Sequence, residues 1–185
     1  MPPLTSPPQE ARTVELLGFS SKPRPPLEFV EVEENRQGLC PPRYRDRLLI
    51  HTLHDGTTIP DYVLDAGPVR RLERDGTLWQ LYTRERDWGA NLVAEELAFA
   101  LGLRGYYRVN TARVVLDYNR FPGESAATGN ALDRLAILAP FSQLLPHQRK
   151  RRLLEEHYDV ISEQMERALQ GKLLFLSIHT YDKHN

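Results

Sequence analysis

Two apolar runs in the sequence each end at a histidine with an aspartate close by. The first spans residues 48–56 (LLIHTLHDG), and the second spans residues 173–182 (LLFLSIHTYD). Runs of this length predict buried strands, and open α/β sheets hold their reactive groups at the carboxyl ends of their strands. We therefore expect one functional site built from both strand ends, around His54 and His179.

Metal binding is the chemistry that this pattern suggests. Two imidazoles can hold zinc, and a carboxylate commonly completes a catalytic site of three protein ligands. Asp87 offers a carboxylate just before a predicted helix, although a carboxylate there can instead cap the helix. His51 is an alternative to His54, but His54 lies just past the end of the predicted strand and is better placed to face a cleft. An exposed or hydrogen-bonded histidine remains the alternative to a metal ligand at each position.

A second polar group ends a later apolar segment. Asp117, Asn119 and Arg120 follow it closely, and Arg113 precedes them. An arginine can receive a substrate carboxylate through two parallel hydrogen bonds. The alternative is an ion pair that joins the segment to its loop.

The remaining elements follow from hydrophobic periodicity and breaker residues. Alternating residues at 27–32 predict a half-exposed edge strand, and residues 47–53 predict a buried strand. Apolar residues at helical spacing predict a helix after Asp87 that Gly102 ends, and the longest helix over about 146–169. Further expected segments are strands at 78–82 and 173–178, and a loop at 121–130. Residues 106–110 and 112–117 predict a pair of strands or one long bent strand. Strands that alternate with helices predict a three-layer α/β fold with a mainly parallel or mixed sheet and flanking helices.

The bulk composition favours one folded domain after a tail. The chain has 185 residues, of which 41% are hydrophobic and 26% charged, so it can form a sizeable core. Residues 1–26 hold seven of the fourteen prolines, which predicts an extended, poorly ordered tail. We expect a single α/β domain over residues 27–185.

The composition also argues against several classes of partner. A formal net charge of −1 argues against a dedicated nucleic-acid binder. The basic run at 149–152 is followed by Glu155 and Glu156, which predicts i,i+4 ion pairs on a solvated face. No apolar run approaches the ~20 residues of a membrane span. A single cysteine, Cys40, excludes a disulfide within the chain and favours a reducing cytoplasm.

Four motifs, taken in order, resemble those of the N-formylglutamate amidohydrolase family. They are residues 54–60 (HDGTTIP), similar to the family's His-Ser-Gly…Ile-Pro; residues 86–91 (RDWGAN) before a helix; residues 113–120 (RVVLDYNR), similar to its Arg-x-x-x-Asp-x-Asn-Arg; and residues 178–182 (IHTYD), similar to its strand that ends in His-Ser or His-Thr. The resemblance covers about residues 48–185. It implies a zinc-carboxypeptidase-like (phosphorylase/hydrolase-like) fold and metal-dependent hydrolysis of the amide of an N-acyl acidic amino acid, such as N-formylglutamate.

The resemblance also implies roles for particular residues. His54 and His179 would hold the metal, with Asp87 as the acidic ligand or as a partner that orients a ligand, and the metal is zinc in preference to other divalent ions. Arg113 and Arg120 would bind the substrate carboxylate, with Asp117 and Asn119 holding them. The catalytic group would comprise His54, Asp55, Asp117 and Arg120. The expected partner is a small N-acyl amino acid, with no nucleic acid and no membrane.

The sequence departs from the family pattern at two places. Asp55 stands where the family usually has a serine, and it could serve as a ligand or change the substrate preference. Family members also continue for several strands and helices after the segment that resembles residues 178–182, so we expect the domain to be incomplete at its C-terminal end. The alternative function is a catalytically impaired member of the same fold that binds carboxylates or has a regulatory role.

Overall fold

A computed structural model describes Phe19 and residues 24–120 and 136–180 of the chain. Most of the expected tail and the expected loop at 121–130 lie outside these residues. The elements, in chain order, are β1 (Leu27–Glu31), α2 (Pro42–Arg45), β2 (Leu48–Thr52), α3 (Asp61–Leu64), α4 (Gly67–Arg74), α5 (Thr77–Glu85), α6 (Ala90–Leu101), β3 (Gly105–Val109), α7 (Phe141–Leu144), α8 (His147–Leu153), the π-helical turn η2 (Leu154–Tyr158), α9 (Asp159–Leu169) and β4 (Leu174–Ile178).

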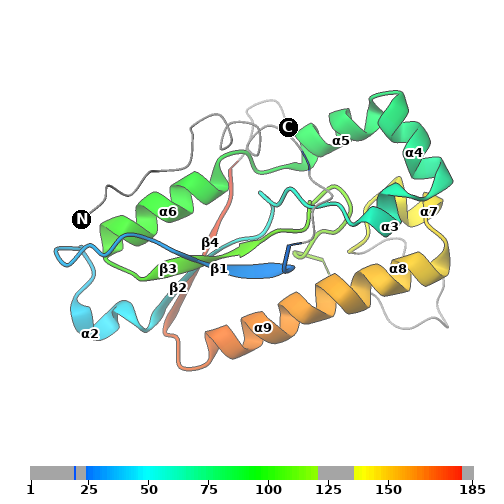
Figure 1. The fold of residues 1–185 in the computed structure, drawn as a ribbon. Helices are drawn as coiled ribbons and strands as arrows, with labels where there is room; N and C mark the ends of the chain where they lie inside the picture. The colour runs from blue at the N-terminus through cyan, green and yellow to red at the C-terminus, as the bar shows by residue number, and fades with distance from the viewer. Residues whose placement is uncertain (1–18, 20–23, 121–135, 181–185) are drawn as a thin grey trace, which may run out of the picture.

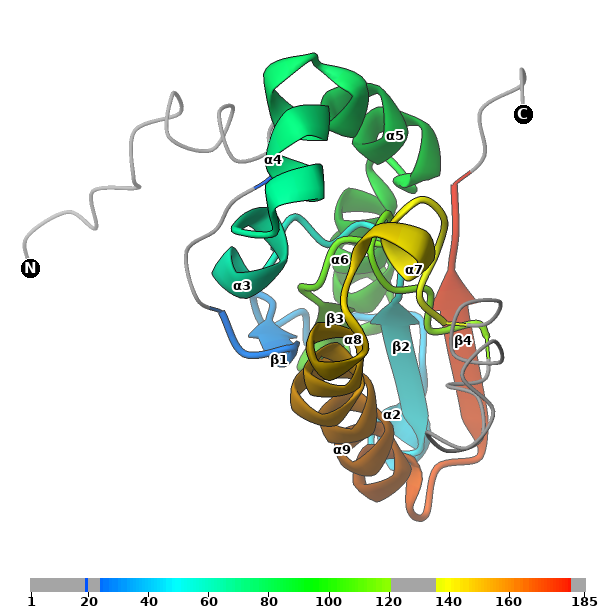
Figure 2. The same ribbon diagram turned by 90° about the vertical axis from the view of Figure 1, so that its right-hand side faces the viewer.

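The described strands form a mixed sheet in the order β1-β3-β2-β4. β2 runs parallel to both β3 and β4, whereas β1 runs antiparallel to β3. Helices flank both faces, with α6 on one side of the sheet and α9 on the other (Figures 1 and 2). The expected α/β class with a mixed sheet and flanking helices is therefore confirmed.

The two sheet faces follow from the alternation of side chains along β2. Leu49 and Leu53 pack with Ile161 and Met165 of the α9 side, whereas Ile50 packs with the alanines of α6. Side chains alternate between faces because a strand has a period of two. His51 has the same parity as Leu49 and Leu53, so it lies on the α9 face.

The two long helical predictions are confirmed. α6 ends where Gly102 adopts a left-handed φ of +72°, which suits glycine because it has no Cβ. The predicted helix over 146–169 is present as α8, η2 and α9. The predicted i,i+4 pairs are also present, since Arg151 lies 2.6 Å from Glu155 and Arg152 lies 2.7 Å from Glu156.

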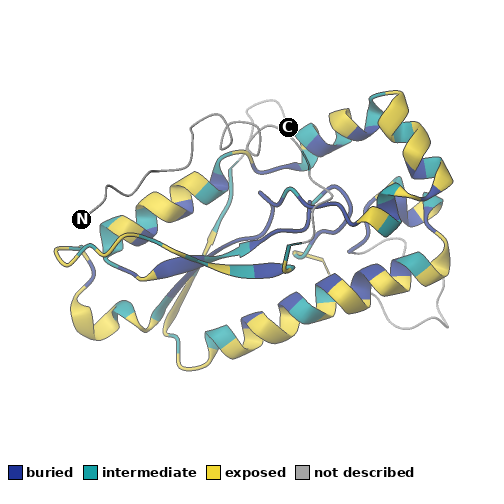
Figure 3. Ribbon diagram, in the orientation of Figure 1, coloured by how far each residue is buried: buried dark blue, intermediate teal, exposed yellow. Residues whose placement is uncertain are grey.

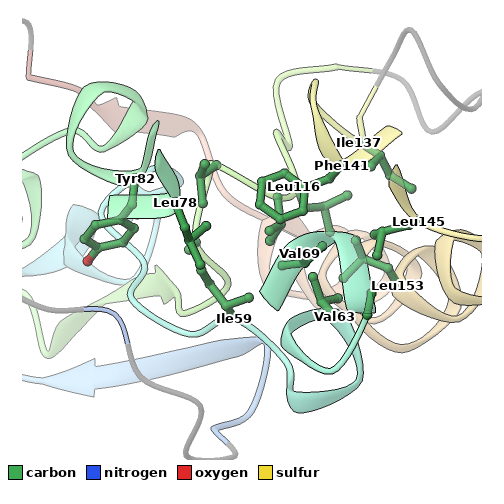
Figure 4. Close-up of a cluster of buried hydrophobic side chains, with 14 of the residues drawn as sticks. Ile59, Val63, Val69, Leu78, Tyr82, Leu116, Ile137, Phe141, Leu145 and Leu153 are labelled. Atoms are coloured by element: carbon green, nitrogen blue, oxygen red, sulfur yellow. The ribbon is translucent and has the colours of Figure 1, made fainter. Parts of the chain in front are cut away.

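A second core lies beyond the carboxyl ends of the parallel strands. There the short helices α3, α4, α5 and α7 pack with α8 around buried aliphatic and aromatic side chains (Figure 4). Ile59, Val63, Leu78 and Phe141 are among its fully buried members. This helical cap supports the chain segments that carry the polar residues following β2 and β3.

Two predicted strands are absent from the described sheet. Residues 78–82 belong to α5, where Leu78 and Tyr82 are buried one helical turn apart, so the correct period was 3.6 and not 2. The strand predicted at 112–117 is a turn, because the amides of Val115 and Leu116 bind the carbonyl of Ala112. The neighbouring prediction at 106–110 is confirmed in β3.

The strand predicted at 173–178 is present as β4, but the expectation that it is buried was wrong. β4 lies at the edge of the described sheet, and Leu173, Leu174 and Phe175 are 67%, 48% and 40% exposed (Figure 3). An apolar run predicts a strand equally well at the centre or at an edge, because neighbours along the sheet are not encoded locally. None of the described helices has the length and apolar character that a membrane span requires.

Candidate metal centre

Three of the predicted site residues, His54, Asp87 and His179, meet at the carboxyl ends of β2 and β4. His54 follows β2, His179 follows β4, and Asp87 lies in the short connection between α5 and α6. Two contacts fix this connection against the strand ends. The amide of Asp87 donates to the carbonyl of His54 at 3.1 Å, and the hydroxyl of Thr180 donates to the carbonyl of Trp88 at 2.9 Å.

The side chains of these three residues converge. Asp87 Oδ2 lies 2.7 Å from His179 Nδ1 and 3.4 Å from His54 Nδ1. The side chains of His54 and Asp87 are 1% and 5% exposed, whereas that of His179 is 19% exposed. The centre is therefore closed on the side of β2 and reachable on the side of β4.

The outer nitrogen of each imidazole has its own partner. His54 Nε2 lies 3.0 Å from Asp117 Oδ1, and His179 Nε2 lies 2.9 Å from the hydroxyl of Ser177. When Asp117 accepts the Nε2 proton of a neutral His54, the lone pair of Nδ1 faces Asp87. Metal-ligating histidines are commonly oriented in this way by a carboxylate or hydroxyl behind them.

The carboxylates around His54 shift its protonation. Burial alone lowers the pKa of His54, but the contacts with Asp117 and Asp87 outweigh burial and raise it above its usual value. Burial likewise opposes the charge of Asp117, yet His54 and neighbouring donors hold the pKa of Asp117 at about 2. The pKa of Asp87 is also lowered, because its contacts with the two histidines outweigh burial. The site therefore favours positive charge between its carboxylates.

Both predicted substrate-binding arginines lie beside Asp117. Arg113 contacts Asp87 Oδ1 at 3.2 Å and Asp117 Oδ2 at 3.5 Å, and Arg120 contacts Asp117 Oδ2 at 3.3 Å. The side chain of Arg113 is 26% exposed and that of Arg120 is 50% exposed. Asn119 is exposed and contributes its backbone amide, which donates to Asp117 Oδ1 at 2.9 Å. Arg113 thus belongs to the buried network, and Arg120 reaches solvent.

Asp55 is not part of the converging group. Its Oδ1 accepts a hydrogen bond from Arg86 Nε at 2.6 Å, and its Oδ2 accepts one from the amide of Asn91 at 3.0 Å. Burial raises the pKa of Asp55 by more than the guanidinium of Arg86 lowers it. Asp55 therefore caps the start of α6, a role that the sequence had offered as the alternative for Asp87.

Sequence reasoning missed two residues of the site and its surroundings. Ser177 precedes His179 by two positions at the end of β4, so the spacing of the two polar side chains was a usable signal. Arg86 was quoted within a motif, but no local pattern indicated that its partner would be Asp55. His51, the alternative to His54, is 4% exposed and packs against the ring of Phe175 at 4.1 Å, and it is outside the converging group.

The residues present fit a divalent metal ion. One ligand atom from each of His54, Asp87 and His179 lies within 4.8 Å of the others. His54 Nδ1 is buried, and no atom in the described part of the chain forms a hydrogen bond with it. Bonds of about 2.0–2.1 Å in a tetrahedral site place neighbouring ligand atoms about 3.4 Å apart, and His54 Nδ1 and Asp87 Oδ2 are separated by 3.4 Å. The 2.7 Å contact between Asp87 and His179 is a hydrogen bond that would lengthen around a metal.

Comparisons with known proteins do not identify a family for this chain. No protein-family model matches the sequence, and neither the curated proteins nor the solved structures that were searched include a match.

Proposed function

We propose that this chain is a metal-dependent amidohydrolase that cleaves the amide bond of an N-acyl acidic amino acid, such as N-formylglutamate. The observation that carries the proposal is the convergence of His54, Asp87 and His179. Two imidazoles and one carboxylate are the ligand types of several catalytic zinc sites. The resemblance of four motifs to the N-formylglutamate amidohydrolase family supports the same reaction, a zinc ion and a zinc-carboxypeptidase-like fold.

Some residues of the site would bind the metal or the substrate, and others would orient the residues that bind. A divalent metal held by the triad would polarise the substrate carbonyl and lower the pKa of a bound water towards neutrality. Asp117 Oδ1, 3.0 Å from Nε2, would accept the Nε2 proton of a neutral His54 and so leave Nδ1 available as a ligand. Arg120, half exposed beside Asp117, is suited to receive the substrate carboxylate, and Arg113 braces both Asp87 and Asp117.

Two assays on the same proteins test the proposal, one for metal binding and one for hydrolysis. We expect the wild-type protein to take up about one zinc ion per chain in a titration calorimeter and to release formate from N-formylglutamate. His54→Ala and His179→Ala should each abolish both, whereas His147→Ala, at the exposed start of α8, should change neither. A purified protein that has not been treated with chelator, holds no metal and takes up none on titration would contradict the proposal.

One observation favours a second candidate function. Among the described residues, the two further carboxylates beside the triad, Asp55 and Asp117, are both held by arginines, and neither is poised as a general base. A protein that binds carboxylates without hydrolysing the amide fits this arrangement. Calorimetry with N-formylglutamate, run beside the formate assay, separates the two functions. Binding without turnover favours the second candidate, and rapid turnover excludes it.

A further inference from the structure

Two pairs of residues that are adjacent in the sequence lie where the end of β2 contacts the connection between α5 and α6. His54 and Asp55 form one pair, and Arg86 and Asp87 form the other. Adjacent side chains in extended backbone point to opposite sides, and Arg86 is extended with φ −82° and ψ 134°. His54 and Asp87 accordingly meet at the candidate metal centre, while Asp55 and Arg86 meet away from it.

Asp55 and Arg86 form a buried ion pair, and Arg86 has further contacts. Arg86 Nε lies 2.6 Å from Asp55 Oδ1, and the two side chains are 3% and 1% exposed. The guanidinium also donates to the hydroxyl of Tyr82 at 2.8 Å and lies over the ring of Trp88 at 4.3 Å. These contacts fix the guanidinium on several sides, so the residue next to Asp87 has little freedom.

The same carboxylate ties down the helix that follows. Asp55 Oδ2 accepts the amide of Asn91 in the first turn of α6, whose cap residue, Gly89, has no side chain to do so. The side-chain amide of Asn91 returns to the carbonyl of Asp55 at 3.3 Å, and its oxygen accepts from Thr52 at 2.6 Å. The segment 86–91 is thus attached to the end of β2 before and after Asp87.

We propose that the Asp55–Arg86 ion pair is the positioning element of the metal centre, because it sets the separation between His54 and Asp87. Neither residue would touch the metal, and each acts through the ligand next to it in the chain. The inference rests on the metal centre of the proposed function. Residues that orient ligands from behind typically change metal affinity 10–100-fold when they are replaced.

Metal affinity and coordination spectrum provide the test. Asp55→Asn keeps an oxygen that can accept from Asn91 but loses the charge that pairs with Arg86. Arg86→Lys keeps the charge but loses the planar guanidinium that contacts Asp55, Tyr82 and Trp88 together. We expect each variant to bind zinc about 10–100-fold more weakly, in competition with a chromophoric chelator. We also expect the visible absorption of the cobalt-loaded protein to change, which a loss of stability alone would not cause.

An ion pair elsewhere in the sheet, with Arg108 and Glu28 side chains 23% and 39% exposed, controls for the loss of an ion pair as such. Glu28 and Arg108 pair at 2.7 Å across β1 and β3, and Glu28→Gln should leave zinc affinity and the cobalt spectrum unchanged. Tyr82→Phe removes one hydroxyl partner of Arg86 and leaves the ion pair in place. This variant tests the inference if the ion-pair variants do not fold, and we expect it to lose several-fold in zinc affinity. Affinities within twofold of wild type overturn the inference while the proposed function stands. A wild-type protein that binds no metal overturns both.

Discussion

His179 depends on Ser177, two positions earlier in β4, for the orientation of its ring. The hydroxyl of Ser177 lies 2.9 Å from His179 Nε2, and this contact leaves Nδ1 directed at Asp87. Ser177 lies in β4 and His179 follows its end, so the contact joins residues only two positions apart. The outer ligand of the candidate centre is therefore oriented locally, unlike His54, whose partner Asp117 lies 63 positions away.

Removing the hydroxyl of Ser177 should weaken metal binding with little effect on folding. We expect Ser177→Ala to lower zinc affinity about tenfold, the lower end of the range for such partners, because solvent can replace an exposed hydroxyl. Titration calorimetry measures the affinity, and urea unfolding of the metal-free protein should show a change within about 0.5 kcal/mol. Thr83→Ala in α5 is the control, and an unchanged affinity for Ser177→Ala would remove Ser177 from the site.

His51 should make the protein sensitive to acid. Burial, followed by the nearby His179 and His54, lowers the pKa of His51 from 6.5 to about 3. Between these values the unfolded chain binds a proton that the folded chain does not, so the free energy of unfolding falls as the pH falls. We expect the advantage of His51→Leu over wild type to grow by about 1.4 kcal/mol per pH unit below pH 6.5.

Urea unfolding at several pH values, with a chelator present, measures this advantage. His147→Leu replaces an exposed histidine and controls for the loss of a histidine as such. A difference between wild type and His51→Leu that stays constant from pH 7 to pH 4 would show that folding does not lower the pKa of His51.

The sequence could identify individual ligands better than the contacts behind them. His54 and His179 were identifiable because each ends an apolar run, and strand ends are sites where side chains gather. Asp87 had two interpretations, since a carboxylate before a helix is also the usual cap. The structure shows that Asp55 caps the helix instead, and its partner Arg86 is 31 positions away. No periodicity links two such positions, so only the folded arrangement reveals the pair.

At the scale of elements, the segment after β2 lies so close to the segment after β3 that position 56 requires glycine. A Cβ on Gly56 would lie 2.4 Å from the carbonyl oxygen of Thr111 and 2.6 Å from that of Asn110. The same segments are paired beyond the strands, where the amide of Thr58 donates to the carbonyl of Asn110 at 2.8 Å. The atoms next to Gly56 belong to the backbone, and this backbone cannot move aside as a flexible side chain would.

Gly56→Ala should therefore destabilise the protein. We expect a loss of about 1–3 kcal/mol in the free energy of unfolding, the range for overpacking a filled interior. Gly67→Ala is the matched control, because nothing lies within 4 Å of its added Cβ at the start of α4, and it should be neutral or stabilising. Urea unfolding of both variants measures the contrast, and equal stabilities would show that the segments separate at little cost.

Element type could be predicted where the period was long and unambiguous, and it failed where the segment was short. The helices near 90–101 and 147–169 repeat their apolar positions over several turns, so the period of 3.6 was clear. Residues 78–82 offered only five positions, in which helical and strand periods are hard to separate. The segment at 112–117 has strand-like composition, but it is buried in the helical cap and turns there.

At the scale of the whole molecule, the two edges of the described sheet differ in charge. β1 carries Glu28 and Glu31, and charged side chains on an edge strand discourage pairing with another chain. β4 has no charged residue, its members Leu174 and Phe175 are exposed, and Leu173 just before it is exposed too. Two copies of an uncharged strand can pair antiparallel without placing like charges opposite each other. The edge at β4 is therefore the one suited to self-association.

We expect the protein to self-associate through β4 with increasing concentration, and Leu174→Lys, within the strand, to suppress this association. A lysine on an exposed edge strand introduces a charge whose desolvation is costly. In a two-fold dimer this charge is also repelled by the same lysine of the other copy. Leu39→Lys is the matched control, because Leu39 is 81% exposed and lies outside the strands, so the added charge is the same but the edge is untouched. Sedimentation velocity over a range of concentrations measures the effect. A protein that remains monomeric at every concentration, or one in which both lysine variants associate as wild type does, would show that the exposed edge does not govern assembly.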